Sequence, residues 1–297
     1  MQNDAGWIAV DWGTTNRRAY AFDRTGHRID QFADAAGILA VGAEGFPAAV
    51  ATIRERLGQG PMLLAGMIGS NRGWAEASYL PCPLDLATLA GALTPAPDGR
   101  GWIVPGARYT DDDRFDVMRG EEVQLLGAIA DGLVPPGGLA CLPGTHAKWA
   151  WVAGRSIAGF RTVMTGELFA LLRTHSILAP QLRAPVQPDA AFCAGVDRSL
   201  RVGDLTAELF GVRARSLLAD FPPEQASAFT SGLLIGADVR AGLACPADPA
   251  HPVALIGDPI LTTLYAAALD RAGRPAIQID GETAFLAGIK AIAETLP

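Results

Sequence analysis

Lysine is nearly absent from this sequence of 297 residues, where it occurs only twice, and the 31 acidic residues outnumber lysine and arginine together (24). The net charge of −7 argues against a nucleic-acid-binding surface, because such a surface must neutralise many phosphates. No run of 18 apolar residues occurs, so we expect no membrane-spanning segment. The four cysteines are far apart and form no C-x-x-C pair, which argues against a zinc knuckle and favours reduced thiols. With no secretory-signal pattern at the start, we expect a cytoplasmic protein.

Two common catalytic motifs are also missing. The sequence has no G-x-x-x-x-G-K-[ST] phosphate loop and no G-x-S-x-G nucleophile elbow. It does have the composition of a globular protein, since 49% of the residues are apolar and 19% are charged. A chain of this length suits two domains of ordinary size.

The first distinctive segment, residues 7–22, has the pattern of two antiparallel strands joined by a short turn. An apolar run leads to Asp11, and Gly13, Thr14 and Thr15 follow in the turn. Glycine lets a ligand approach the backbone closely, and the threonine hydroxyls add donors suited to phosphate oxygens. Asp11 could meet a Mg²⁺ ion carried by a nucleotide. The alternative is an ordinary hairpin whose Asp and Thr side chains satisfy the turn backbone.

An acidic cluster at residues 111–113 precedes a segment with helical apolar spacing over about 117–130. We therefore expect the acids at or just before a helix N-terminus, where the helix dipole favours ionised carboxylates. An ionised carboxylate can act as a general base. A solvated loop or a helix cap is the alternative for these acids.

The order of elements recurs after a Pro-Pro-Gly-Gly break at residues 135–138. A short strand, a turn containing Gly144, Thr145 and His146, two more strands and a helix repeat the opening pattern. We therefore expect two similar domains, 1–134 and 135–297, that face each other across a cleft. Residues 177–200 are expected to be irregular. Further on, we expect helices at about 203–219 and 222–243, a strand at 253–256, a helix capped by Asp258 and Pro259, a strand at 275–279 and a final helix at 281–294.

This order of elements resembles the superfamily of ATPases that includes sugar kinases, hsp70 and actin. The resemblance implies an α/β fold in which two ribonuclease-H-like domains with mixed sheets surround a central nucleotide cleft. It also implies that the two turns bind ATP phosphates, that Gly257 lies near the adenosine, and that the helices at about 117–130 and 282–295 connect the domains.

Five strings narrow the match. In sequence order, they are Asp11-Trp12-Gly13-Thr14-Thr15-Asn16, Ala65-Gly66-Met67-Ile68-Gly69-Ser70-Asn71, Val117-Met118-Arg119-Gly120-Glu121-Glu122, Pro143-Gly144-Thr145-His146-Ala147-Lys148-Trp149 and Phe160-Arg161-Thr162-Val163-Met164-Thr165-Gly166-Glu167-Leu168. Together they resemble the 2-dehydro-3-deoxygalactonokinase family. The resemblance implies ATP- and Mg²⁺-dependent phosphorylation of 2-dehydro-3-deoxy-D-galactonate at its 6-hydroxyl, in galactonate catabolism.

The resemblance also suggests roles for residues. Hexokinase-like relatives place their base just before the first connecting helix, which indicates Asp113, with Asp112 second. The substrate is an anion and needs a cation, so the strings suggest these substrate-binding residues: Asn71, Arg72, Arg119, Lys148 and Arg161. A structural salt bridge to Glu121, Glu122 or Glu167 is the alternative for each cation. His146 could bind phosphate or substrate, or its imidazole could hydrogen-bond only to a neighbouring group of the protein.

Competing functions remain open at this point. Another sugar or sugar-acid kinase of the same superfamily is the first alternative. A non-catalytic sugar-sensing repressor is another, although a helix-turn-helix segment would be expected before Trp7. A chaperone or filament-forming ATPase would need insertions that 297 residues do not accommodate. We expect a small-molecule sugar-acid partner, no nucleic acid, no membrane and a possible homodimer.

Overall fold

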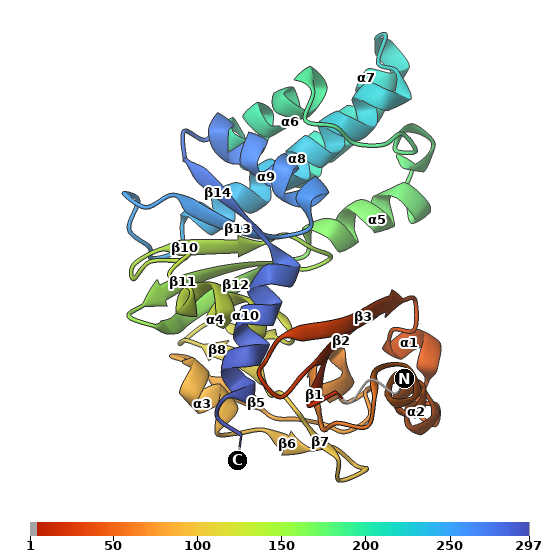
Figure 1. Cartoon of the computed structure of the whole chain (residues 1–297). Coiled ribbons are helices and arrows are strands. Elements are labelled where there is room, and N and C mark those ends of the chain that lie inside the picture. The colour runs from red at the N-terminus through yellow and green to blue at the C-terminus, as the bar shows by residue number, and fades with distance from the viewer. Residues whose placement is uncertain (1–4, 297) are drawn as a thin grey trace. The chain divides into compact units, whose positions relative to one another are not determined.

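The computed structural model describes residues 5–296 and divides the chain into two compact units, drawn in Figure 1. Unit 1 contains the chain up to Gly132, residues 155–158 and the chain from Glu282 onward, and unit 2 contains Leu133–Gly154 and Gly159–Gly281. The C-terminal helix thus groups with the N-terminal part of the chain. The domain limits 1–134 and 135–297 themselves stay a prediction.

Unit 1 is built on a six-stranded sheet in the order β3-β2-β1-β4-β7-β6. The first three strands form an antiparallel meander, β1 runs parallel to β4, and β4 runs parallel to β7. Helices α1 (Ile38–Val41) and α2 (Phe46–Leu57) follow the meander. The strands are β1 (Trp7–Trp12), β2 (Arg17–Phe22), β3 (Arg28–Asp34), β4 (Met62–Gly66), β6 (Thr94–Pro95) and β7 (Gly101–Ile103).

A second, three-stranded sheet of unit 1 corrects one prediction. Residues 117–120 are not helical: β9 (Phe115–Met118) pairs antiparallel with β8 (Gly106–Thr110), which pairs with β5 (Tyr79–Pro81). Helix α4 begins only at Glu121 and ends at Ala130. Val117 misled the prediction because its spacing to the apolar residues of α4 is helical, yet it is 51% exposed on a strand. The other elements here are η1 (Met67–Gly69), α3 (Leu86–Ala90) and α10 (Gly281–Ala293).

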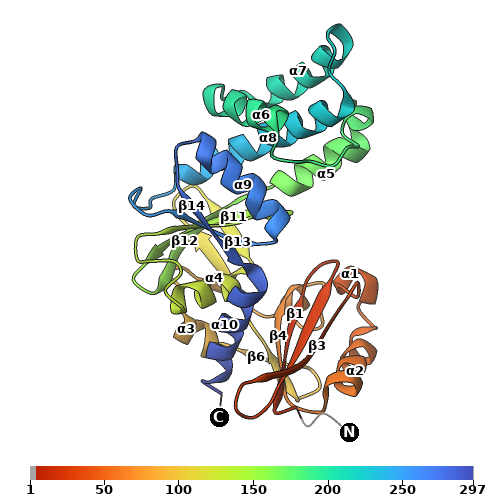
Figure 2. The same cartoon turned by 45° about the horizontal axis from the view of Figure 1, so that its top comes forward.

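Unit 2, drawn from a second angle in Figure 2, repeats the strand arrangement with the order β12-β11-β10-β13-β14. The sheet is mixed, because β10 is antiparallel to β11 and parallel to β13. Its strands are β10 (Leu139–Leu142), β11 (Ala147–Ala153), β12 (Ser156–Val163), β13 (Val253–Gly257) and β14 (Ala276–Asp280). Its helices are α5 (Thr165–His175), η2 (Ala179–Gln181), α6 (Ala190–Arg201), α7 (Leu205–Leu218), α8 (Pro223–Leu243) and α9 (Pro259–Arg271).

In both sheets the first strand of the unit lies third, with the meander on one side and a parallel neighbour on the other, although the edge strand β6 of unit 1 is antiparallel to β7. The predicted α/β class with mixed sheets and a duplicated order of elements is confirmed. The predicted cap of α9 is confirmed too, since the Asp258 side chain accepts a hydrogen bond from the Ile260 N–H and Pro259 is the first helical residue.

The prediction of irregular structure over residues 177–200 is wrong in its second half. Helix α6 begins after Asp189, whose side chain accepts from the Phe192 N–H. Phe192 and Val196 are buried one turn apart, and a methyl group on Gly195 would lie 2.2 Å from the Phe229 carbonyl oxygen of α8. The prediction missed this short amphipathic helix because the prolines before residue 189 indicated irregular structure.

Helices α4 and α10 cross within unit 1 at two glycines. A methyl group on Gly127 would lie 2.1 Å from the Ala284 carbonyl oxygen, and one on Gly288 would lie 2.1 Å from the Val123 carbonyl oxygen. Only glycine at both positions allows the backbones to approach this closely. Within residues 5–296, no helix is both long and apolar enough to cross a membrane.

Candidate active site

The first turn, between β1 and β2, has its carbonyl oxygens tied back into unit 1. The backbone N–H groups of Gly37, Ile38 and Leu39, at the start of α1, donate to the carbonyls of Thr15, Gly13 and Thr14 at 3.1–3.2 Å. Within the described chain, the N–H groups of Thr14 and Thr15 have no hydrogen-bond acceptor, and both residues are exposed. Free N–H groups on a turn whose carbonyls are occupied form an anion-binding surface.

Asp11 lies directly before this turn, near the end of β1, with 23% of its side chain exposed. Burial raises the pKa of Asp11 to about 6, the Arg18 guanidinium opposes this shift, and the Glu121 carboxylate adds to it. The nearest Arg18 nitrogen lies 3.8 Å from an Asp11 carboxylate oxygen. A carboxylate that is desolvated and close to a second carboxylate gains by binding a cation, so this donor set suits Mg²⁺.

Two glycines bring the start of α4 to the same end of the sheet. Gly66 ends β4 with φ +91°, and a methyl group on it would lie 2.8 Å from the Trp12 carbonyl oxygen. Gly120, with φ +103°, precedes α4, and a methyl group on it would lie 3.2 Å from the Gly66 Cα. Because of this contact, the Glu121 carboxylate comes close enough to raise the pKa of Asp11. No pattern in the sequence pointed to a functional role for Glu121.

Glu122 holds Gly120 in place from inside the protein. Its side chain is fully buried, and its two carboxylate oxygens accept from the Gly120 N–H at 2.9 and 2.7 Å. Burial, together with the neighbouring Glu121 carboxylate, raises the pKa of Glu122 to about 8. The carboxyl group therefore holds its proton over much of the physiological range of pH.

Arg119 is the buried cation of this region, with 8% of its surface exposed. Its Nη2 donates to the Ala77 carbonyl at 2.7 Å, its Nε donates to the Tyr79 hydroxyl at 3.3 Å, and its guanidinium lies 4.1 Å from the Tyr79 ring centroid. Its Nη1 has no hydrogen-bond partner among residues 5–296. This nitrogen lies at the loop of residues 69–73, since a methyl group on Gly69 would be 2.8 Å from it.

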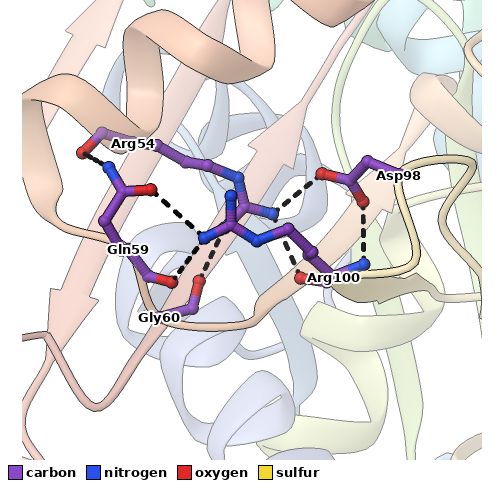
Figure 3. Close-up of polar contacts among 5 residues, drawn as sticks. All are labelled: Arg54, Gln59, Gly60, Asp98 and Arg100. Carbon is purple, nitrogen blue, oxygen red and sulfur yellow. Dashed lines mark hydrogen bonds and ion pairs between the residues drawn. The ribbon is translucent and has the colours of Figure 1, made fainter.

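Other buried arginines of unit 1 differ from Arg119, because each has a carboxylate partner. Arg17 pairs with Asp34 at 2.6 Å. Arg54 pairs with Asp98 at 2.9 Å and also donates to the carbonyls of Gly60 and Arg100, as Figure 3 shows. A buried guanidinium with neither a carboxylate nor a full set of acceptors is costly, so Arg119 is a candidate for binding an external anion.

The remaining predicted residues of unit 1 occupy two exposed segments. Asn71 and Arg72 are exposed in the loop that Arg119 contacts, and the Arg72 N–H donates to the Ser70 hydroxyl at 3.3 Å. Asp112 and Asp113 are exposed in the turn between β8 and β9, eight or more residues before α4. The expectation that a helix N-terminus favours their ionised forms is therefore wrong. The turn is organised by Asp111, whose side chain accepts from the Asp113 and Arg114 N–H groups.

The second turn, between β10 and β11, is constructed like the first. The Glu167 N–H of α5 donates to the Thr145 carbonyl at 3.0 Å, and the Lys148 ammonium donates to the His146 carbonyl at 2.9 Å. Within the described chain, the N–H groups of Gly144, Thr145 and His146 have no hydrogen-bond acceptor. Space above Gly144 is open, since a methyl group there would meet nothing within 4 Å.

Gly257 lies beside this second turn at the end of β13. Its φ is +149°, and a methyl group on it would lie 3.7 Å from the Pro143 carbonyl oxygen. Gly281, at the start of α10, packs on Gly257 as Gly120 packs on Gly66, with a methyl-to-Cα distance of 3.0 Å. In each unit, therefore, a glycine at a strand end lies between the turn with unbonded N–H groups and the start of a helix.

The other candidate residues of unit 2 have partners within the unit. The His146 imidazole pairs with the Glu167 carboxylate, so the predicted alternative of a satisfied histidine describes its contacts. Lys148 is buried beneath the turn, with 4% of its surface exposed. Arg161 on β12 donates to the Ala241 carbonyl at 3.3 Å. Within residues 5–296, no group of three or more His, Cys, Asp or Glu side chains could hold a metal ion.

These observations define an α/β protein of two related units, each with a turn after its first strand that presents backbone N–H groups suited to an anion. The family model described as 2-keto-3-deoxy-galactonokinase matches residues 11–292. The chain is similar to the 2-dehydro-3-deoxygalactonokinase of Escherichia coli K12, with 40% identity over 98% of this chain and 99% of that protein. The chain therefore belongs to the 2-keto-3-deoxy-galactonokinase family, and the predicted family is confirmed.

Two further matches extend the comparison. A Rhizobium meliloti protein provisionally named 2-dehydro-3-deoxygalactonokinase DgoK1 is 36% identical over 98% of this chain and 97% of its own length. A crystal structure from Sinorhizobium meliloti, also provisionally described as a 2-dehydro-3-deoxygalactonokinase, has a TM-score of 0.91 at 36% identity, covering 97% of this chain and 98% of that one. The fold described here is thus the fold of a crystallised relative.

Proposed function

We propose that this protein is a phosphotransferase that uses ATP to phosphorylate 2-dehydro-3-deoxy-D-galactonate at its 6-hydroxyl, in galactonate catabolism. The family and the named relatives support a kinase over a sugar-sensing repressor. The observation that carries the chemistry is the pair of turns. Within residues 5–296, the N–H groups of Thr14 and Thr15 in the first turn, and of Gly144, Thr145 and His146 in the second, have no hydrogen-bond acceptor. Phosphoryl transfer needs such fixed donors for positioning and charge stabilisation.

The nucleotide is bound, in this proposal, by backbone groups of both turns. Thr14 and Thr15 bind phosphate oxygens from one turn, where Gly13 lets the phosphates approach the backbone closely. Gly144, Thr145 and His146 bind them from the other turn. Gly257 lies next to the adenosine, where the absence of a side chain leaves room for it. Asp11 binds the Mg²⁺ that accompanies ATP, and Mg²⁺ supplies neutralisation of phosphate charge when it is bound.

The sugar acid is bound through its carboxylate by Arg119. The unpartnered Nη1 supports this assignment, since a carboxylate oxygen would complete the hydrogen bonds of a buried guanidinium. Asn71 and Arg72, on the adjacent loop, contact the sugar hydroxyls or the same carboxylate. Lys148 and Arg161 are also predicted substrate-binding residues. Each donates to a backbone carbonyl, so in this proposal they support the site from within the unit.

Asp113 is the proposed base for the 6-hydroxyl proton, with Asp112 as its alternative. An Asp113→Asn variant should keep ATP affinity and lose turnover by roughly 10²-fold, within the range of general-base catalysis. Asp112→Asn is the matched control, because it removes a neighbouring exposed carboxylate from the same turn. Full turnover in Asp113→Asn would exclude Asp113 from this role.

A coupled assay of ADP release tests the proposed reaction. The galactonate-derived 2-keto-3-deoxy acid should drive ADP release with a higher kcat/KM than its gluconate-derived epimer, and the product should be a 6-phosphate. ADP release driven better by another sugar acid would favour the alternative kinase. The homodimer and the cytoplasmic location stay predictions from the sequence.

A further inference from the structure

We propose that Asp238, a buried residue outside the candidate site, is a positioning residue for the second turn. This inference rests on the proposed role of that turn in binding phosphate. Asp238 lies on α8 and is fully buried, and within residues 5–296 no basic side chain is hydrogen-bonded to its carboxylate. A buried carboxylate is costly unless its oxygens accept hydrogen bonds, so its partners identify what it organises.

The Asp238 carboxylate accepts hydrogen bonds from side chains on three different elements. The Trp149 indole N–H of β11 donates to Oδ1 at 2.6 Å, and the Thr165 hydroxyl of α5 donates to Oδ2 at 2.6 Å. The Tyr265 hydroxyl of α9 also donates to Oδ2. One side chain therefore fixes β11, α5 and α9 against α8. Trp149 is held from a second point as well, because a methyl group on Gly242, one turn after Asp238, would overlap its indole ring.

The donor on α5 connects Asp238 to the second turn through consecutive residues. Thr165 is the first residue of α5 and bonds Asp238. At the next position, a methyl group on Gly166 would lie 2.5 Å from the Gly144 carbonyl oxygen. Glu167 then donates its N–H to the Thr145 carbonyl and pairs its carboxylate with His146. A shift of Thr165 would therefore displace the helix start that supports the turn backbone.

The donor on β11 fixes the other side of the turn. Trp149 follows His146 by three residues and pairs with Cys141 in the register of β10 and β11. The turn is thus held at its start through α5 and at its end through β11, and both supports meet at one carboxylate. Small misplacement of groups that bind a reacting phosphate can cost about 10²-fold in rate.

The experiment compares Asp238→Asn and Thr165→Val with wild type, with thermal unfolding measured in parallel. Asparagine preserves the shape but removes one acceptor oxygen, and valine preserves the shape of threonine but removes its hydroxyl. Both variants should raise KM for ATP roughly tenfold or more while KM for the sugar acid stays unchanged. Thr165→Ser, which restores the hydroxyl, should restore KM for ATP.

Ser227→Ala is the matched control on the same helix. It removes a partly buried hydrogen bond, from the Ser227 hydroxyl to the Ala184 carbonyl at 2.8 Å, that does not contact the turn. It should lower the unfolding temperature without changing either KM. Wild-type KM for ATP in folded Asp238→Asn and Thr165→Val, or equal rises in both KM values, would overturn the proposal. If Asp238→Asn does not fold, Thr165→Val against Thr165→Ser decides the question.

Gly144→Val separates this proposal from the function on which it rests. The space above Gly144 is open, so valine fits the fold but blocks an approaching phosphate. Weaker ATP binding in Gly144→Val alone, with Asp238→Asn and Thr165→Val unchanged, would overturn only the positioning role. Unchanged ATP binding in Gly144→Val would instead contradict the phosphate-binding role of the turn and overturn the positioning proposal with it.

Discussion

Gly120 packs directly on Gly66, so that the last residue before α4 touches the last residue of β4, next to the turn that follows β1. Gly281 and Gly257 have the same relationship in unit 2. Because neither member of a pair carries a side chain, the start of a helix can reach the carboxyl ends of two parallel strands. That arrangement places Glu121 close enough to influence Asp11.

Gly120→Ala should destabilise the protein and reduce turnover. Its φ of +103° is strained for alanine, and the new methyl group would lie 3.2 Å from the Gly66 Cα. Together these effects should lower the free energy of unfolding by about 1–3 kcal/mol, as measured by urea denaturation. Gly132→Ala is the control, since φ is +72° there but nothing lies within 4 Å. Equal losses in both variants would show that the Gly66 contact has no energetic role.

Activity should depend on the ionisation of Asp11. Its pKa of about 6 means that the carboxylate gains a proton as pH falls through 6 and then loses its capacity to bind a cation. We expect kcat/KM to fall below pH 6 and to reach a plateau above about pH 7, and added Mg²⁺ should move the midpoint to lower pH. Asp11→Asn should lose this pH dependence and roughly 10–100-fold of activity. A wild-type profile without a step near pH 6 would contradict the assignment.

Arg119→Gln should raise KM for the sugar acid by roughly 10–100-fold, because it removes one hydrogen bond between charged groups. KM for ATP should not change. Arg54→Gln is the matched control, because Arg54 is as deeply buried in the same unit but already pairs with Asp98. That control should lower the unfolding temperature and leave the KM values unchanged. Selective loss of ATP affinity in Arg119→Gln would assign its anion site to the nucleotide instead.

Stability should depend on pH through Glu122. Its folded-state pKa of about 8 lies above the ordinary value of 4.5, so the stability it contributes is fully present below about pH 4.5 and is lost as pH rises through 8. The Glu122→Gln variant stays neutral throughout. Its free energy of unfolding relative to wild type should therefore increase between pH 5 and pH 8, by an amount on the order of a few kcal/mol. A constant difference across that range would refute the raised pKa.

The sequence was informative wherever the signal was local. Both turns, the two meanders and the cap of α9 follow from short patterns of glycine, threonine, aspartate and proline. The duplicated order of elements then made the fold class predictable. Helix α4 was placed too early because strand β9 and α4 share an apolar spacing, which cannot distinguish a strand followed by a helix from a longer helix.

Features that depend on distant residues could not be predicted in this way. Arg119 was a candidate from its string alone, but its missing hydrogen-bond partner depends on Ala77 and Tyr79, about 40 residues earlier. The approach of Gly120 to Gly66 and the three donors around Asp238 depend equally on tertiary contacts. Asp238 has no motif around it, and only the fold shows what it organises.

A crystal structure with Mg²⁺ and a non-hydrolysable ATP analogue tests the central claim most directly. We expect phosphate oxygens to accept hydrogen bonds from the N–H groups of Thr14 and Thr15 in the first turn and of Thr145 and His146 in the second. An analogue whose phosphates touch neither turn, or only one of them, would contradict this account of the site.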